Sequence, residues 1–134
     1  MTGEAFAALS QHTILGRLMQ GETQDEQAFD RGVKRSADSG GLLHHLFGAR
    51  TLVLAGLLAE TGTKSYLSGL LIGHEVRAAL AGLPPDARIH LAGDANLCRL
   101  YARAIKTAGR NAMIGSDDAA ILGLARIGGL AQWT

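Results

Sequence analysis

A glycine–aspartate turn in the segment IHLAGDANLC, residues 89–98, has residue types suited to approach a ligand. Glycine at the carboxyl end of a parallel strand lets the backbone come close to a ligand, and a following helix offers unpaired N–H groups. Alternatively, Asp94 is the N-cap of that helix and accepts the N–H of Asn96 or Leu97. The residues leave both interpretations open. A carboxylate at Asp94 would repel phosphate, so the adenosine or ribose end of a nucleotide suits Gly93 better.

Other reactive side chains lack the partners that metal binding would need. His74 and Glu75 begin like the zinc-protease helix, but residue 78 is alanine where that motif requires its second histidine. On a helix the adjacent His44 and His45 would diverge by about 100°, so they are interpreted as core or partly exposed histidines. We therefore expect no metal site in this chain.

The two candidate nucleophiles are better interpreted as packing residues. Ser68 stands in YLSGL, which lacks the first glycine of a nucleophile elbow and has no evident histidine partner. Cys98, between Leu97 and Leu100, is predicted to be a small buried hydrophobe. It is the only cysteine, so no internal disulfide forms, which is typical of the reducing cytoplasm. The sequence also lacks a Walker lysine loop and a dinucleotide fingerprint, so no catalytic residue is expected.

Composition restricts the class of protein. A chain of 134 residues, 47% of them hydrophobic, is long enough to bury a core as one domain. Lysine and arginine total 13 against 12 acidic residues, without local concentration, which argues against nucleic-acid binding. The apolar tract 41–59 contains His44, His45 and Arg50, so it indicates a core helix and no membrane span. The N-terminus has no basic residue before Arg17, unlike a secretory signal.

Apolar periodicity predicts helices in the first part of the chain and strands only later. The N-terminal helices are expected over residues 2–20, with Thr2 as N-cap and a break near Gly16 or Gly21, and then over 23–39, 42–58 and 62–82. In the last of these, one face is formed by Tyr66, Leu67, Leu70, Leu71 and Val76.

After Pro85 the pattern changes to strand, helix, strand and helix. The segments are 88–92, 96–108, 111–115 and 116–128, and their order predicts two parallel strands joined by a right-handed crossover. Two parallel strands make a poor sheet, so missed elements or another chain should complete it. The fold class is α/β and helix-dominated.

The order of three stretches resembles the C-terminal half of sugar kinases in the actin-like ATPase superfamily. These stretches are SYLSGLLIGHEVRAAL, IHLAGDANLCRLYARAI and DDAAILGLARIG. Together with MTGEAFAALSQHTILGRLM and GGLLHHLFGARTLVLAGLL, they resemble the 2-dehydro-3-deoxygalactonokinase family over nearly the whole chain. The resemblance implies a single domain over 1–134, the adenosine-side lobe, with a helical part at 1–60 and a nucleotide-binding part at 61–134.

The resemblance also implies an activity and a site. The family phosphorylates 2-dehydro-3-deoxy-D-galactonate to its 6-phosphate with ATP and Mg²⁺, in galactonate breakdown. Gly93, Asp94, Ala95 and Asn96 would line the adenosine pocket, and Ser68, Gly69, Gly73 and Asp118 would lie nearby. Many sugar kinases have a second glycine where this chain has Asp94, which agrees with the electrostatic argument against phosphate at that position.

The family's phosphate-binding loops have no counterpart in these 134 residues, so we expect the chain alone not to turn over. Two alternatives stay open: a non-catalytic helical interaction module, or a lobe of a related kinase for another sugar. The expected partners are a small sugar acid and ATP, with no nucleic acid and no membrane. An apolar face left uncovered would also favour self-association into a homodimer.

Overall fold

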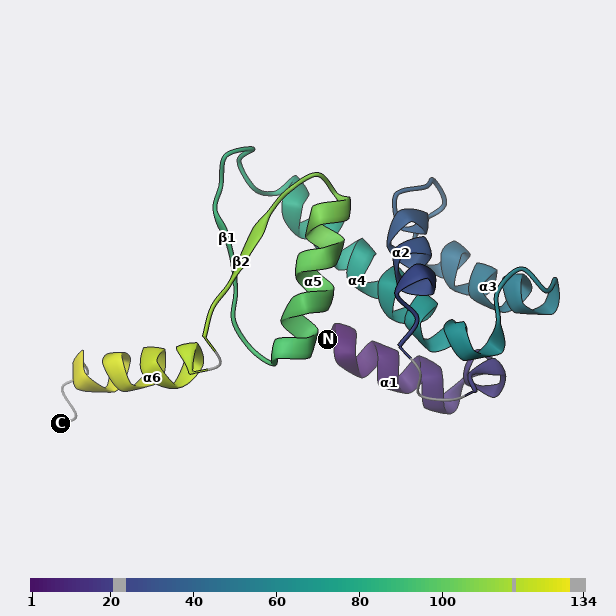
Figure 1. Ribbon diagram of the computed structural model, residues 1–134, viewed down its shortest axis with the longest axis horizontal. Coiled ribbons are helices and arrows are strands. Elements are labelled where there is room, and N and C mark those ends of the chain that lie inside the picture. The colour runs from purple at the N-terminus through teal and green to yellow at the C-terminus, as the bar shows by residue number, and fades with distance from the viewer. Residues whose placement is uncertain (21–23, 117, 131–134) are drawn as a thin grey trace. The chain divides into compact units, whose positions relative to one another are not determined.

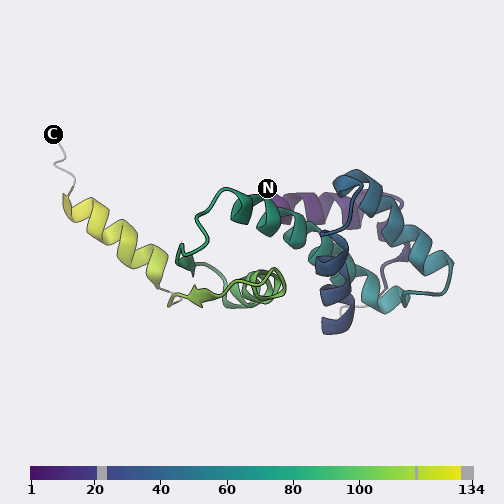
Figure 2. The same cartoon turned by 90° about the horizontal axis from the view of Figure 1, so that it is seen from above.

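The computed structural model describes residues 1–20, 24–116 and 118–130. They form helices and a small parallel sheet in two compact units, Met1–Pro84 and Pro85–Thr134 (Figures 1 and 2). We describe each unit by itself. The helix-dominated α/β class predicted from the sequence is confirmed, whereas the assignment to one domain stays a prediction.

The N-terminal unit is built on one long helix. Its elements are α1 (Thr2–His12), the 3-10 turn η1 (Gly16–Leu18), α2 (Glu26–Arg35), α3 (Gly41–Leu54), the 3-10 turn η2 (Glu60–Gly62) and α4 (Thr63–Ala81). The helices α1, α2 and α3 all contact α4, and α2 contacts it most extensively. α4 ends before Gly82, because Pro84 and Pro85 follow and proline cannot continue a helix. α4, which the resemblance placed in the nucleotide-binding part at 61–134, packs with the helices that precede it, and the division at residue 60 stays a prediction.

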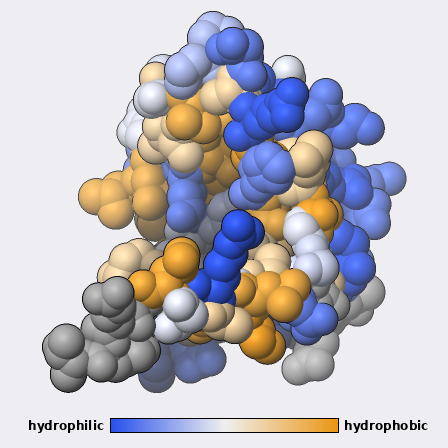
Figure 3. Space-filling view, turned by 90° about the vertical axis from the view of Figure 1, so that its left-hand side faces the viewer, coloured by the Kyte–Doolittle hydropathy of each residue, from blue (hydrophilic) through white to orange (hydrophobic). Residues whose placement is uncertain are grey.

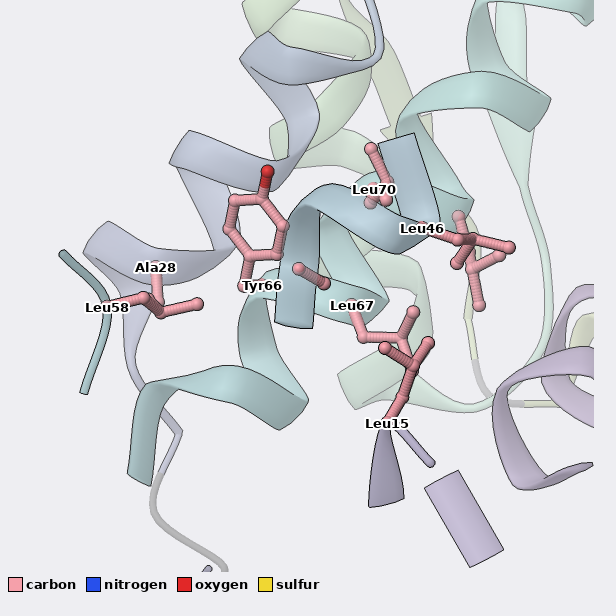
Figure 4. Packing of buried hydrophobic residues seen from close by; sticks show 9 residues of the cluster. Leu15, Ala28, Leu46, Leu58, Tyr66, Leu67 and Leu70 are labelled. Carbon is pink, nitrogen blue, oxygen red and sulfur yellow. The ribbon is translucent and has the colours of Figure 1, made fainter. Parts of the chain in front are cut away.

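The core of this unit lies on the face of α4 that the sequence predicted. Leu67 and Leu70 are 0% exposed and Tyr66 is 1% exposed. Figure 4 shows Leu67 next to Leu15, and Tyr66 on the side of the cluster where Ala28 and Leu58 lie. The predicted face of α4 is confirmed, since Leu71 and Val76 are buried as well.

Glycines allow α2 and α4 to touch through their backbones. A Cβ atom added at Gly69 would lie 2.1 Å from the carbonyl oxygen of Phe29. One added at Gly32 would lie 2.2 Å from the carbonyl oxygen of Tyr66. Both distances are far below van der Waals contact, so any larger residue at these two positions would push the helices apart.

The helix predicted over 23–39 is shorter in the structure. α2 begins at Glu26, where Asp25 is its N-cap and its Oδ1 atom accepts the N–H of Ala28 at 2.9 Å. It ends at Arg35, well before the predicted stop. α2 has the acidic Glu26 in its first turn and the basic Lys34 and Arg35 in its last turn, which suits the helix dipole.

Two other helix limits also differ from the prediction. Thr2 is not the N-cap of α1, because the helix already includes it and Met1 occupies that position without a side-chain bond. α1 stops before the break predicted near Gly16. The helix predicted over 42–58 ends at Leu54, because the chain turns back there through backbone bonds to its own last turn.

The C-terminal unit has the predicted strand–helix–strand–helix order. Its elements are β1 (Ile89–Leu91), α5 (Ala95–Thr107), β2 (Ala112–Ile114) and α6 (Ala119–Leu130). β1 and β2 are parallel and pair Ile89 with Ala112, His90 with Met113 and Leu91 with Ile114. The two parallel strands that the sequence predicted are thus present, and within the described residues the sheet has no other strand. Its completion by another chain stays a prediction.

The core of the C-terminal unit is thin. α5 contacts both strands, and its buried residues are Cys98, Ala104 and Ile105. Cys98 is the buried hydrophobe that was predicted, whereas its neighbour Leu97 is 50% exposed. Across the part of the chain that the structure describes, no helix combines the length and apolarity needed to cross a membrane.

The last helix extends away from the strands (Figures 1 and 2). Its large apolar side chains are exposed: Ile121, Leu122, Leu124, Ile127 and Leu130. Helical spacing distributes these residues around most of the helix circumference. Such a helix is normally buried, so α6 is an uncovered apolar surface.

Candidate functional site

The turn between β1 and α5 has the geometry that favours glycine. Gly93 has φ +142°, a conformation that side-chain-bearing residues rarely adopt. A Cβ atom added there would meet no heavy atom within 4 Å. The backbone conformation therefore requires glycine at this position, while the space beside it is open.

Asp94 is the N-cap of α5. Its Oδ1 atom accepts the N–H of Leu97 at 2.9 Å, and its carbonyl oxygen accepts the N–H of Cys98 at 2.8 Å. The interpretation of Asp94 as the N-cap of this helix is thus confirmed, and the N–H group that its side chain accepts is that of Leu97. The first N–H groups of a helix have no intrahelical acceptor, so those of Ala95 and Asn96 are directed out of the helix start.

Side chains around this helix start are exposed and polar. Asp94 and Asn96 are both exposed, and Asn96 Oδ1 accepts a hydrogen bond from Nη2 of Arg99. The helix start therefore carries an anion, an amide and a guanidinium within one and a half turns. Because Asp94 offsets the positive end of the helix dipole, this turn is less suited to a phosphate than an uncharged glycine turn would be.

A second glycine turn lies at the same edge of the sheet. β2 ends at Ile114, and the N–H of Gly115 donates to the carbonyl oxygen of Leu91 at 2.8 Å. The turn after β2 therefore lies beside the one that leads to Gly93. Asp118 follows, exposed at the start of α6, where its carbonyl oxygen accepts the N–H of Leu122 at 2.9 Å.

The carboxyl ends of parallel strands are where ligands bind in α/β folds. Gly93, Asp94, Ala95 and Asn96 thus lie at such an edge, and Asp118 follows its second turn. The sequence reasoning treated Gly115 as the end of a strand and missed its place in this edge. The available signal was a glycine directly after the second strand.

The remaining predicted site residues, Ser68, Gly69 and Gly73, belong to α4 in the N-terminal unit. Gly73 packs against α2 as Gly69 does. A Cβ atom added at Gly73 would lie 2.5 Å from Oγ of Ser36, the C-cap residue of α2. Ser68 is partly buried. Contact with α2 therefore accounts for glycine at both Gly69 and Gly73.

Two histidines on different helices, which no sequence motif had paired, are in contact. His45 is 0% exposed, and its Nδ1 atom lies 3.0 Å from Nε2 of His74. His44 is exposed, so of the two adjacent histidines, interpreted from the sequence as core or partly exposed, only His45 lies in the core. Burial first, and then the positive charges of His45 and Arg77, lower the pKa of His74. Because the partners are distant in sequence, no local motif could reveal the pair.

The described residues offer no metal centre. They contain no group of three or more histidine, cysteine or acidic side chains arranged to hold an ion. The donor set for Mg²⁺ is thus not found in this part of the chain.

Comparison with known proteins identifies related sequences. The family model described as 2-keto-3-deoxy-galactonokinase matches residues 1–127. A Rhizobium meliloti (strain 1021) protein named "Probable 2-dehydro-3-deoxygalactonokinase DgoK1" is 33% identical over 129 residues, which is 92% of this chain and 42% of that protein. The 2-dehydro-3-deoxygalactonokinase of Escherichia coli (strain K12) is 28% identical over 120 residues, which is 90% of this chain and 41% of the relative.

A solved structure is also similar. A crystal structure from Sinorhizobium meliloti, whose name assigns it the same activity, superposes with a TM-score of 0.79 at 31% identity. The match covers 91% of this chain and 42% of the other. The chain therefore spans less than half the length of the relatives that it matches.

Proposed function

Since the chain belongs to the 2-keto-3-deoxy-galactonokinase family, we propose that it is the adenosine-binding part of a kinase for 2-dehydro-3-deoxy-D-galactonate. The observation that carries this proposal is the edge formed by two glycine turns, after β1 and after β2. The whole enzyme would have the actin-like fold, would use ATP with Mg²⁺ and would be cytoplasmic, as the resemblance and the single cysteine suggest.

In this proposal the C-terminal unit binds the uncharged end of the nucleotide. The adenosine would lie in the open space beside Gly93 and be fixed by the outward N–H groups of Ala95 and Asn96. Asp118 would border the second turn. Gly69 and Gly73 would act indirectly by holding α4 against α2, and Ser68 stays a predicted neighbour of the site.

The phosphate half of the reaction is assigned to parts of the kinase outside these 134 residues. Phosphoryl transfer requires a phosphate cradle and metal ions that bridge the phosphates. The sequence has no lysine-containing glycine loop, and the described residues have no metal-holding group. We therefore expect no turnover from this chain in a coupled kinase assay.

Nucleotide binding can be tested by NMR titration of the ¹⁵N-labelled chain with adenosine and, separately, with ATP. We expect weak binding, with the largest amide shifts at Gly93 to Asn96 and Gly115. Without Mg²⁺, adenosine should bind at least as well as ATP, because the Asp94 carboxylate repels the phosphates. Shifts confined to other elements, or no shifts with adenosine, would contradict the proposal.

Two glycines of the same unit give a matched pair of variants for this titration. Gly93 and Gly109 both have positive φ, of +142° and +81°, and both have open space at the Cβ position. Gly109 follows α5, away from the carboxyl edge. Gly93→Ala should therefore weaken adenosine binding, while Gly109→Ala also strains a positive-φ turn and leaves binding unchanged. Equal effects would assign the loss to strain alone.

We also propose that the chain self-associates through its exposed apolar surface. Side chains on α6 such as Leu124 and Leu130 are 70% and 79% exposed, and Figure 3 shows hydrophobic residues at the surface on one face of the molecule. Sedimentation velocity over a range of concentrations should show a dimer that Leu124→Asp abolishes. A monomer at all concentrations would remove this part of the proposal without affecting the kinase assignment.

A further inference from the structure

The buried imidazole of His45 joins three segments of the N-terminal unit. Its Nε2 atom lies 3.0 Å from the carbonyl oxygen of Ser39, in the turn that precedes α3. Its Nδ1 atom lies 3.0 Å from Nε2 of His74 on α4. The ring is 0% exposed, so these two contacts satisfy both of its nitrogens away from water.

The directions of these hydrogen bonds follow from the chemistry of the carbonyl group. A carbonyl oxygen only accepts, so Nε2 of His45 must carry the hydrogen and donate to Ser39. In the neutral ring, Nδ1 of His45 is then an acceptor, and Nε2 of His74 must donate to it. This arrangement leaves Nδ1 of His74 as the nitrogen that can take up a proton.

Protonation of His74 leaves the hydrogen bonds of the pair in place but puts a charge at a partly buried position. A proton on Nδ1 of His74 keeps both bonds, because Nε2 of His74 still donates to Nδ1 of His45. His74 is partly buried, and the centroid of the His45 ring lies 5.1 Å from its own. The charged form of His74 is therefore favoured when α3 moves away from α4 and leaves the ring in water.

The sign of the pH dependence follows from the lowered pKa of His74. Below the ordinary histidine value the unfolded chain binds more protons than the folded chain, so acid favours unfolding. The contribution of the pair to stability is complete above the unfolded pKa of about 6.5 and is lost as the pH falls toward the folded value.

Other charged groups lie on the elements around the pair. They include Arg35, the last residue of α2, and Asp38 beyond it, His44 on α3, Glu75 and Arg77 on α4, and Glu4 on α1. Arg35 and Asp38 form an ion pair with each other. Burial is the largest cause of the lowered pKa of His74, and the positive charges of a protonated His45 and of Arg77 add to it.

We propose that His45 and His74 form a proton-sensitive fastener, which holds α3 on α4 at neutral pH and releases α3 in mild acid. The histidine pair matters most for α3, because α3 contacts α4 far less extensively than α2 does. Local opening of α3 can therefore precede unfolding of the α2–α4 core.

Hydrogen exchange of the 134-residue chain, followed by mass spectrometry and corrected for intrinsic rates, tests this proposal. From about pH 7.5 to about pH 5, where histidine is the ordinary side chain that titrates, protection of residues 41–54 should fall about tenfold. Protection of α2 should change much less. Equal protection of α3 at both pH values would overturn the proposal.

A matched variant separates the titration from the hydrogen bond. His74→Gln supplies an amide donor to Nδ1 of His45 but cannot be protonated, so its loss of α3 protection in acid should be less than about twofold. His90→Gln, which changes an exposed histidine on β1, should behave like the unchanged chain. An undiminished acid response in His74→Gln would overturn the proposal.

Histidine ¹⁵N NMR of the unchanged chain gives a readout that does not depend on the folding of any variant. It should show both rings of the pair with hydrogen on Nε2 at neutral pH, and the first protonation on Nδ1 of His74. Hydrogen on Nδ1 of His45 at neutral pH would contradict the proposed direction of the bonds.

Discussion

The two units of this chain use similar residues in different ways. In the N-terminal unit, helix glycines such as Gly32 and Gly69 lie against a neighbouring backbone, and leucines such as Leu70 are buried. In the C-terminal unit, Gly123 of α6 has nothing within 4 Å of its Cβ position, and Leu124 is 70% exposed. Both units are rich in small and apolar residues, but the N-terminal unit buries more of them, while those of α6 in the C-terminal unit are exposed.

This difference bears on the nucleotide proposal. The N-terminal unit has a core of its own, whereas the C-terminal unit has an open sheet edge, an open glycine turn and an uncovered helix. A parallel sheet normally has helices over both faces. Within the described residues, α5 is the one helix that packs extensively against β1 and β2. We therefore infer that the C-terminal unit is completed by a ligand or by another protein surface.

The largest expected effect comes from removing a buried side chain. Leu70→Ala should lower the free energy of unfolding of the N-terminal unit by about 2–5 kcal/mol, because it leaves a cavity in the core. Leu124→Ala in α6 should change the stability of the dissociated chain, measured below the concentration at which it self-associates, by less than about 0.5 kcal/mol, since that side chain is exposed. Denaturant-dependent hydrogen exchange, followed separately in the two units, measures both. A large loss for Leu124→Ala would mean that α6 is covered in solution.

The fold was predictable to the extent that local patterns determine it. Helical periodicity identified α4 and its buried face, and the change of pattern after Pro85 identified β1, α5 and β2. Helix ends were less predictable: Asp25 shortens α2 at its start, and nothing in the periodicity distinguishes this cap from the residues before it. The exposure of Leu97 also depends on which strands exist to cover it.

The candidate site was predictable in part. The local turn of Gly93 and the cap at Asp94 follow from neighbouring residues, so the sequence was sufficient for both. The contact of Gly115 with β1 depends on strand register, and that of His45 with His74 on helix packing. Such contacts join residues that are far apart in sequence, which spacing rules do not address.

A smaller effect is expected from adding a methyl group to a helix glycine. In Gly69→Ala the new Cβ would collide with the carbonyl oxygen of Phe29, 2.1 Å away, so we expect a loss of about 1–3 kcal/mol in the N-terminal unit. Gly123→Ala should instead stabilise α6 by about 0.5–1 kcal/mol, because its Cβ position is open and alanine favours helix. Circular dichroism and hydrogen exchange can compare the two. Destabilisation by Gly123→Ala would indicate that a partner approaches α6 closely.

The smallest effects concern the two aspartate caps. Asp25→Ala should destabilise α2 by about 1–2 kcal/mol and Asp94→Ala should destabilise α5 by about 0.5–1 kcal/mol, because each removes a 2.9 Å acceptor of a backbone N–H. The loss at Asp25 should be larger, since this residue is partly buried and its own N–H donates to Ser65 Oγ on α4.

Asparagine at the same positions separates the cap from its charge. Asp25→Asn and Asp94→Asn keep a side-chain acceptor, so hydrogen exchange of α2 and α5 should return close to that of the unchanged chain. Only Asp94→Asn should also improve ATP binding relative to adenosine, because it removes the carboxylate that repels phosphate. If ATP binding does not improve, the phosphates do not approach Asp94, and the nucleotide meets this unit through its adenosine alone.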